Sequence, residues 1–170
     1  AFYLFFITLR DFFYRKYRNL SQITAHFSFS ILILSILFNN IFSSEVITNL
    51  KINETYQAQN LKINFESIEQ ENKQNFKAIK GKFIVEDQSG LIEVMQPELR
   101  IYNQPNIVTS EADIKTNIFT DKFMTMNYVQ NQDYFNIRYQ VKPFMIWIWI
   151  STILLCFSGC LSLIRKKYEN

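Results

Sequence analysis

Two long apolar runs frame the chain. They extend from Ile23 to Ser44 and from Phe144 to Ile164, and neither contains an acidic residue, a lysine or an arginine. Each is close to the ~20 residues with which an α-helix crosses a bilayer. The pattern predicts a membrane protein in which two transmembrane α-helices flank one soluble domain.

Apolar positions between the runs recur mainly with period two. Leu61, Ile63 and Phe65 alternate with polar residues, and Phe83 and Val85 are likewise two positions apart. Period-two alternation rich in β-branched and aromatic residues is typical of strands that bury one face. The segment is therefore predicted to be a mainly antiparallel β domain.

Two local signals interrupt the predicted strands. Asp87–Gly90 separates two apolar runs and ends in a glycine, which favours a hairpin turn because glycine readily adopts a positive φ. Thr109–Ala112 looks like a helix cap followed by helix-forming residues, so residues 111–117 are expected to form a helical turn or a loop.

These patterns divide the chain into five parts. The first, residues 1–21, is too short to span a bilayer and is expected to be either an interfacial amphipathic segment or the stump of an upstream helix. The others are a first transmembrane helix (22–44), the β domain (45–142), a second transmembrane helix (143–164) and a basic tail (165–170).

Basic residues flank both spans on the sides away from the β domain. They are Arg10, Arg15, Lys16 and Arg18 before the first span and Arg165, Lys166 and Lys167 after the second. By the positive-inside rule both termini lie on the cytoplasmic or matrix side. The net charge of +3 and the pI near 8.8 come from these flanks. Acidic and basic residues nearly cancel inside the β domain, so we expect no nucleic-acid partner.

Motifs for soluble enzymatic chemistry are missing from the sequence. It contains no glycine-rich phosphate loop and no paired histidines at zinc spacing. Its single histidine, His26, falls inside the first apolar run, so no serine or cysteine of the soluble domain has a histidine base. We therefore predict no catalytic residue, and a domain of this size is expected to offer a docking surface.

His26 is the chief candidate for a functional side chain. It lies about one helical turn into the first span, and an ionisable group at that depth is costly and often functional. The imidazole could ligate haem iron, carry a proton or bond to a neighbouring helix, and the residue pattern leaves these roles open. Ser28, Ser30 and Ser35 are expected to face a protein interior.

The second span carries two further signals. Trp147 and Trp149 near its start are predicted to lie at the membrane interface and fix the depth of the helix in membrane lipid. Cys156 and Cys160 lie four residues apart without suitable disulfide geometry. With Thr152 and Gly159 they form a small-residue stripe that would let another helix approach.

Several blocks, taken together and in order, resemble one family. They are Ala25–His26, Glu98–Tyr102, Thr109–Ile114, Phe119–Asp121 and Ile137–Trp149. In this order they are similar to the C-terminal portion of the cytochrome c haem lyase subunit CcmF, which acts in system I cytochrome c maturation. The resemblance covers most of the chain from Ala25 to Tyr168.

The resemblance implies a function and a cofactor. The family's lyase attaches haem covalently to apocytochrome c, and the histidine matching His26 is one axial ligand of a b-type haem. His26 would therefore bind the haem iron, and the second ligand would come from another chain. The family's tryptophan-rich haem-handling segment has no counterpart here, so the partners implied are other haem lyase subunits that carry it, together with apocytochrome c.

The expected function is thus the C-terminal subunit of a split haem lyase, not catalytic on its own. The alternative is a structural accessory subunit of a mitochondrial inner-membrane complex, derived from the lyase but without haem or activity. Abundant Phe, Ile, Asn, Lys and Tyr with few Gly and Pro suggest an AT-rich genome. We expect the mitochondrial inner membrane, with both termini in the matrix and the β domain in the intermembrane space, or the bacterial inner membrane with a periplasmic domain.

Overall fold

The computed structural model describes residues 2–14, 20–58, 61–87 and 90–169, and the side chains of residues 11, 12 and 165–169 lie outside that description. Contacts divide the chain into two compact units. The helical unit comprises Ala1–Ser43, Thr116–Asp121 and Lys142–Asn170, and the sandwich unit comprises Ser44–Lys115 and Lys122–Val141. Most of the basic flanking side chains used to predict orientation fall outside the described residues, so that orientation remains a prediction.

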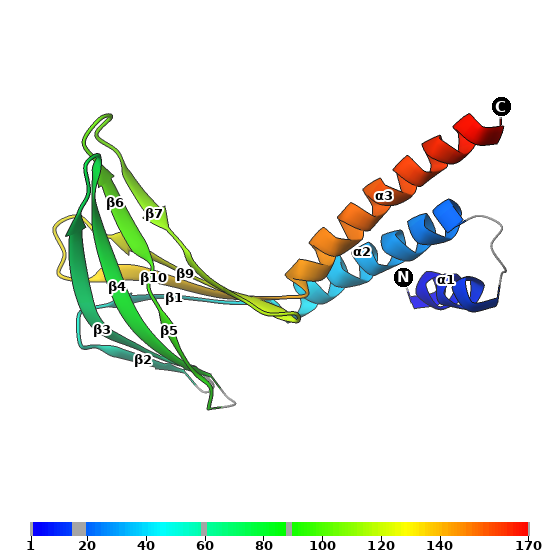
Figure 1. The fold of residues 1–170 in the computed structure, drawn as a ribbon. Coiled ribbons are helices and arrows are strands. Elements are labelled where there is room, and N and C mark those ends of the chain that lie inside the picture. Colours follow the sequence, from blue (N-terminus) through cyan, green and yellow to red (C-terminus); the bar gives the residue numbers. More distant parts are fainter. Residues whose placement is uncertain (1, 15–19, 59–60, 88–89, 170) are drawn as a thin grey trace. The chain divides into compact units, whose positions relative to one another are not determined.

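Among the described residues, three helices form most of the helical unit. They are α1 (Phe2–Tyr14), α2 (Leu20–Phe42) and α3 (Met145–Glu169). Two segments are long and apolar enough to cross a bilayer, Leu20–Phe42 and Met145–Ile164. The helices α2 and α3 lie side by side (Figure 1), and α1 packs on α2 through the stacked rings of Phe5 and Phe27, whose centroids are 5.8 Å apart.

Ten strands lie within the described part of the chain. They are β1 (Ser44–Leu50), β2 (Thr55–Ala58), β3 (Leu61–Asn72), β4 (Phe76–Asp87), β5 (Ile92–Met95), β6 (Glu98–Tyr102), β7 (Val108–Glu111), β8 (Asp113–Thr116), β9 (Thr120–Tyr128) and β10 (Phe135–Pro143). One sheet has the order β1-β10-β9-β8. The other has the order β2-β3-β4-β6-β7, with β5 also pairing with β4. The predicted fold class, two apolar helices flanking an antiparallel β domain, is confirmed.

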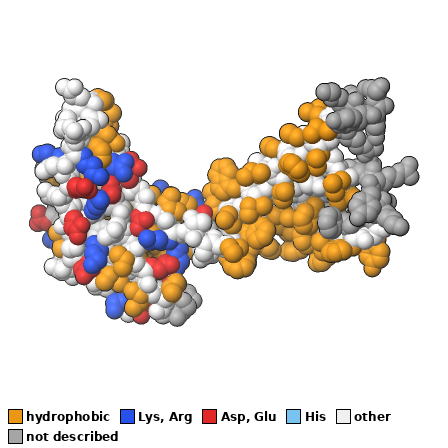
Figure 2. Space-filling model, viewed as in Figure 1, with side chains coloured by type: hydrophobic (Ala, Val, Ile, Leu, Met, Phe, Trp, Pro, Cys, Tyr) orange, Lys and Arg blue, Asp and Glu red, His pale blue; other side chains and the backbone are white. Residues whose placement is uncertain are grey.

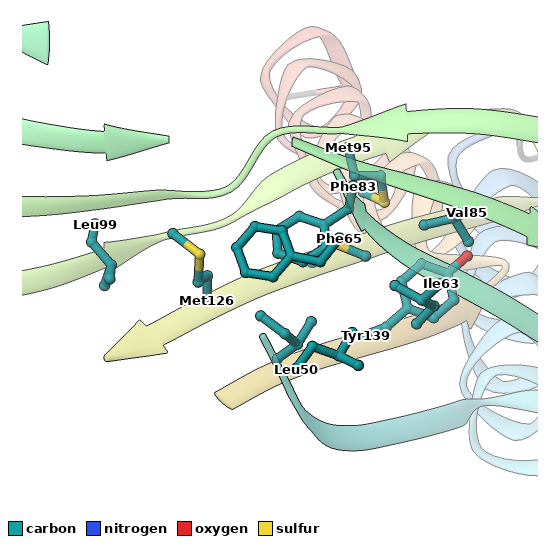
Figure 3. Close-up of a cluster of buried hydrophobic side chains, with 11 residues drawn as sticks. Leu50, Ile63, Phe65, Phe83, Val85, Met95, Leu99, Met126 and Tyr139 are labelled. Carbon is teal, nitrogen blue, oxygen red and sulfur yellow. The ribbon is translucent and has the colours of Figure 1, made fainter. Parts of the chain in front are cut away.

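The core of the sandwich comes from the inward positions of both sheets. Phe65 of β3 and Phe83 of β4 are fully buried, and their rings stack with centroids 4.3 Å apart (Figure 3). Met124, Met126 and Ile137 cover them from β9 and β10. Most outward positions on the same strands are polar, with Ile84 and Phe123 as exceptions, so the alternation read from the sequence is largely the alternation between core and solvent.

The hairpin signal at Asp87–Gly90 is confirmed. Gly90 has a φ of +72°, and its backbone N–H donates to the carbonyl of Asp87 at 3.0 Å. The Asp87 backbone N–H then donates to the carbonyl of Leu91 at 3.2 Å, which aligns β4 with β5. The two middle residues of this turn lie outside the described part of the chain.

The helical turn or loop expected at residues 111–117 is wrong. This segment forms the end of β7 and all of β8, and the chain changes from one sheet to the other at Ala112. Ser110 of the cap-like block and the neighbouring Asp113 bond to residues distant in sequence instead. Ser110 Oγ donates to the carbonyl of Met126 at 2.7 Å, and Asp113 Oδ2 accepts the backbone N–H of Gln96 at 2.7 Å.

Candidate functional site

His26 lies on the exposed side of α2. Gln22 and Phe29, one turn away in each direction, are also exposed, and so are Ile36, Leu37 and Asn40 further along the helix. With Ile33 these positions recur every three or four residues, so they form one face of the helix. We call this set of residues, Gln22, His26, Phe29, Ile33, Ile36, Leu37 and Asn40, the open face.

Within the described part of the chain, His26 makes no hydrogen bond or ion pair. No group of three or more potential metal ligands occurs among the described residues. His26 therefore presents its imidazole on the open face without a hydrogen bond or an ion pair to any described residue.

Small buried residues bring α2 and α3 together. Ser28 of α2 and Ser151 of α3 are fully buried, and Ser35 is 4% exposed. Ser30 is fully buried too, as predicted for the serines of the first span, but it lies about 200° around α2 from Ser28 and so on another face. Ser21 Oγ donates across to the carbonyl of Ser158 at 2.9 Å. Small side chains and an interhelical hydrogen bond are the usual means of close helix packing in membranes.

The other small-residue stripe faces away from α2. Thr152, Cys156, Gly159 and Cys160 are all exposed on α3, and both cysteines are free thiols. A Cβ placed on Gly159 would meet no atom within 4 Å among the described residues. This stripe does not form the α2–α3 contact, and its use by a further helix stays a prediction.

Trp147 and Trp149, both predicted at the membrane interface, have different environments. Trp149 is 62% exposed, whereas Trp147 is half-buried and its indole N–H donates to the carbonyl of Ile118 at 2.9 Å. Ile118 lies in the turn between β8 and β9, at residues 117–119, which belongs to the helical unit. Trp147 is thus tied to this turn as well as to its own helix.

The start of α3 is held by two further contacts. Phe144 has a φ of +60°, which is unusual for a bulky residue, and its N–H donates to the carbonyl of Phe119 at 2.7 Å. The amide of Asn39 donates to the carbonyl of Pro143 at 2.7 Å. Pro143 ends a strand just before the helix, as expected for a residue without an N–H. These contacts fix the end of α2, the turn and the start of α3 as one assembly.

A charged cluster lies between the two sheets of the sandwich. Lys122 of β9 is 9% exposed, and its Nζ lies 2.6 Å from Glu93 Oε2 and 3.4 Å from Asp87 Oδ2. Burial lowers the pKa of Lys122, but the hydrogen bond to Glu93 and the nearby charges outweigh burial and raise it overall.

Tyr139 of β10 adjoins this charged cluster. It is 2% exposed, and its hydroxyl has no hydrogen-bond partner among the described residues. Burial raises the pKa of Tyr139; Lys122 opposes that effect, while Glu93 and Asp87 add to it. No motif in the sequence marks this cluster, because its members come from strands far apart in the chain.

The side chains divide between the two units by type (Figure 2). Hydrophobic side chains cover the visible faces of the helices, whereas Lys, Arg, Asp and Glu gather on the sandwich. The fold and this distribution define the class, which is a polar antiparallel β-sandwich joined in one chain to a pair of apolar helices.

A match to a protein-family model identifies the family of this chain. The model described as "CcmF C-terminal beta-sandwich" matches residues 41–143. The chain belongs to this family, so the resemblance noted from the sequence is confirmed.

Individual relatives agree with that assignment. The chain is 30% identical over 120 residues to the cytochrome c-type biogenesis protein ccl1 of Rhodobacter capsulatus, covering 71% of this chain and 18% of the relative. It is 26% identical over 145 residues to the cytochrome c-type biogenesis protein CcmF of Pseudomonas fluorescens, covering 85% of this chain and 22% of the relative. The chain thus spans about a fifth of the length of these relatives.

A solved structure shares the fold. A chain titled "Cytochrome c Heme Lyase CcmF" matches with a TM-score of 0.66 and 15% identity, over 91% of this chain and 27% of that one. Because the match covers nearly the whole of this chain, the succession of an apolar helix, a β-sandwich and a second apolar helix along the chain is a feature of the shared fold.

Proposed function

We propose that this chain is the C-terminal subunit of a split cytochrome c haem lyase and that His26 supplies one axial ligand to a b-type haem. The observation that carries the proposal is His26 itself, an exposed imidazole on the open face of a helix that is long and apolar enough to span a membrane. Relatives named for cytochrome c biogenesis support the pathway, and the solved haem lyase CcmF supports the fold.

The residues present fit a haem held jointly with another chain. An imidazole nitrogen is a common haem ligand, and the exposed Phe29 and the neighbouring Ile33 offer the apolar surface that a porphyrin needs. A six-coordinate haem needs a second axial ligand, and we assign that ligand to a partner subunit. When bound, such a haem would supply one-electron chemistry that keeps incoming haem iron reduced.

This chain's own residues have a positioning role in the proposal. The α2–α3 contact through the buried serines holds His26 on a rigid helix, with its ring directed away from α3. The sandwich would dock apocytochrome c or a partner subunit by surface complementarity. We place both spans in the mitochondrial inner membrane with the sandwich in the intermembrane space.

Absorption spectroscopy of the purified complex tests the ligand role. We expect His26→Ala to abolish the low-spin b-type signal while the complex still assembles, because an axial ligand is lost but the α2–α3 contact is untouched. His26→Met should retain a low-spin haem with a shifted potential, because a thioether can replace imidazole as an axial ligand. Asn40→Ala is the matched control on the open face and should leave the spectrum unchanged.

An unaltered low-spin signal in His26→Ala would show that the ligand assignment is wrong. The alternative function, a structural accessory subunit without haem, predicts that the chain co-purifies with different proteins. In that case the chain would be recovered in stoichiometric amounts with another large membrane complex, with no haem and no tryptophan-rich lyase partner.

A further inference from the structure

The β8–β9 turn exposes two large apolar side chains beside the start of α3. Ile118 is 62% exposed and Phe119 is 63% exposed. We propose that this turn, residues 117–119, inserts into the bilayer interface and anchors the protein to the lipid surface beside its second span. The proposal rests on the two helices crossing a membrane and does not depend on haem binding by His26.

Hydrogen bonds to the start of α3 fix the level of the turn along the candidate span. The carbonyl of Ile118 accepts the indole N–H of Trp147, and the carbonyl of Phe119 accepts the backbone N–H of Phe144 at 2.7 Å. The candidate span begins at Met145, and Trp147 is its third residue. The turn is therefore level with the end of the span, where the hydrocarbon layer meets the headgroups.

Most backbone groups of the turn already have hydrogen-bond partners within the protein. Asn117 Oδ1 accepts the N–H groups of Phe119 at 2.9 Å and Thr120 at 2.7 Å, and the Asn117 N–H donates to the Thr120 carbonyl at 3.0 Å. Backbone groups that enter an apolar layer must find partners inside the protein, because lipid tails offer none. The turn meets that requirement at four of the six backbone groups of residues 117–119, while the side chains of Ile118 and Phe119 remain exposed.

The exposed apolar surface continues from the turn onto the ends of both helices. At the end of α2, Ile41 is 66% exposed and Phe42 is 59% exposed, and Trp149 of α3 is 62% exposed. All of these residues belong to the helical unit. No charged residue lies between Lys115 and Asp121, so the turn itself carries no charge to oppose insertion. Aromatic and aliphatic residues at this level are typical of the interfacial belt.

Depth-dependent quenching in lipid nanodiscs tests the proposal with three isoleucines of similar exposure. Ile118, Ile92 and Ile153 are 62%, 64% and 68% exposed and lie in the turn, in β5 and inside the span of α3. Each is changed to Cys in the full chain carrying Cys156→Ser and Cys160→Ser, and labelled with an environment-sensitive fluorophore. The nanodiscs contain phosphatidylcholine and phosphatidylglycerol, with spin labels placed either near the headgroups or deep in the acyl chains.

We expect the Ile118→Cys label to be several-fold less accessible to aqueous iodide than the Ile92→Cys label, and to be quenched best by the shallow spin label. The Ile153→Cys label should be quenched best by the deep one. Iodide access at Ile118→Cys equal to that at Ile92→Cys would overturn the proposal. Preferential quenching of the Ile118→Cys label by the deep spin label would also overturn it, and so would free access of iodide to Ile153→Cys.

Discussion

Lys122 is the clearest case of a single residue joining parts of the fold that are distant in sequence. It extends from β9 to two carboxylates contributed by β4 and β5, and so links the two sheets. Such a cation is stabilised only while its partners remain in place, because a buried charge without a partner is costly. The sandwich therefore depends on a polar contact within an otherwise apolar core.

This cluster gives the stability of the sandwich a defined pH dependence. The pKa values of Lys122 and Tyr139 are both raised in the folded state. The stabilisation linked to these two groups is therefore fully present below their unfolded pKa values, which are about 10.4 for Lys and about 10 for Tyr. The contribution is lost as pH rises through the folded values, because the folded state then binds more protons than the unfolded state. We expect the free energy of unfolding to fall above pH ~10, by up to about 1.4 kcal/mol per pH unit for each group.

Denaturant titrations of two variants from pH 8 to 11 check the assignment. Lys122→Met should cost about 2–3 kcal/mol at pH 8, below the cost for a fully buried pair, because Glu93 and Asp87 retain partial solvent access. Tyr139→Phe should be nearly neutral at pH 8, since its hydroxyl has no partner among the described residues, and should flatten the alkaline slope. An unchanged slope in both variants would assign the pH dependence to other groups.

At the scale of elements, the junction between β10 and α3 concentrates the unusual geometry. Phe144 has a left-handed backbone, and its ring lies 5.3 Å from that of Phe38 and 6.4 Å from that of Phe119. The positive φ turns the chain sharply from strand to helix. The ring contacts then secure the helix start against α2 and the β8–β9 turn.

Replacing Phe144 by Ala and by Gly separates these two roles. Both variants lose the ring contacts, but alanine keeps the left-handed strain and glycine does not. We expect Phe144→Ala to be less stable than Phe144→Gly by about 1 kcal/mol, measured from unfolding in detergent. The same pair at Phe157, exposed on a regular part of α3, should show the opposite order because glycine weakens a helix interior. If alanine were the more stable residue at position 144, the left-handed junction would be wrong.

Sequence reasoning succeeded where the deciding signal is local. Each apolar run, and likewise the Asp87–Gly90 turn, is encoded in one continuous stretch of sequence. The predicted helices and the predicted turn match the structure. The prediction of a helical turn or loop at residues 111–117 is wrong because Thr109–Ala112 has the composition of a helix cap. Ser110 instead bonds to Met126, and the neighbouring Asp113 accepts a hydrogen bond from Gln96, and both of these partners are distant in sequence. The hydrogen bond from the indole N–H of Trp147 to the carbonyl of Ile118 joins residues that are 29 apart in sequence, so no local sequence pattern predicts it.

At the scale of the whole molecule, the chain combines two units that expose different kinds of surface. The sandwich has a buried core of its own and a charged surface, whereas the helices expose apolar faces suited to lipid or to other helices. Hydrophobic burial therefore stabilises the sandwich, while packing and backbone hydrogen bonding stabilise helices in an apolar medium. A change in the core of the sandwich should consequently leave the helices intact.

Hydrogen exchange of the full chain in detergent, read by mass spectrometry, can test this independence. Phe65 is fully buried against Phe83, so Phe65→Ala should destabilise the sandwich by about 3–5 kcal/mol and speed exchange throughout β3, β4 and β10. The amides of α2 and α3 should keep their protection, because the micelle and their mutual contact are unchanged. Ile92→Ala, at an exposed position on β5, is the control and should alter neither unit. If Phe65→Ala exposed the helices to exchange at the same rate as the strands, the two units would be shown to unfold together.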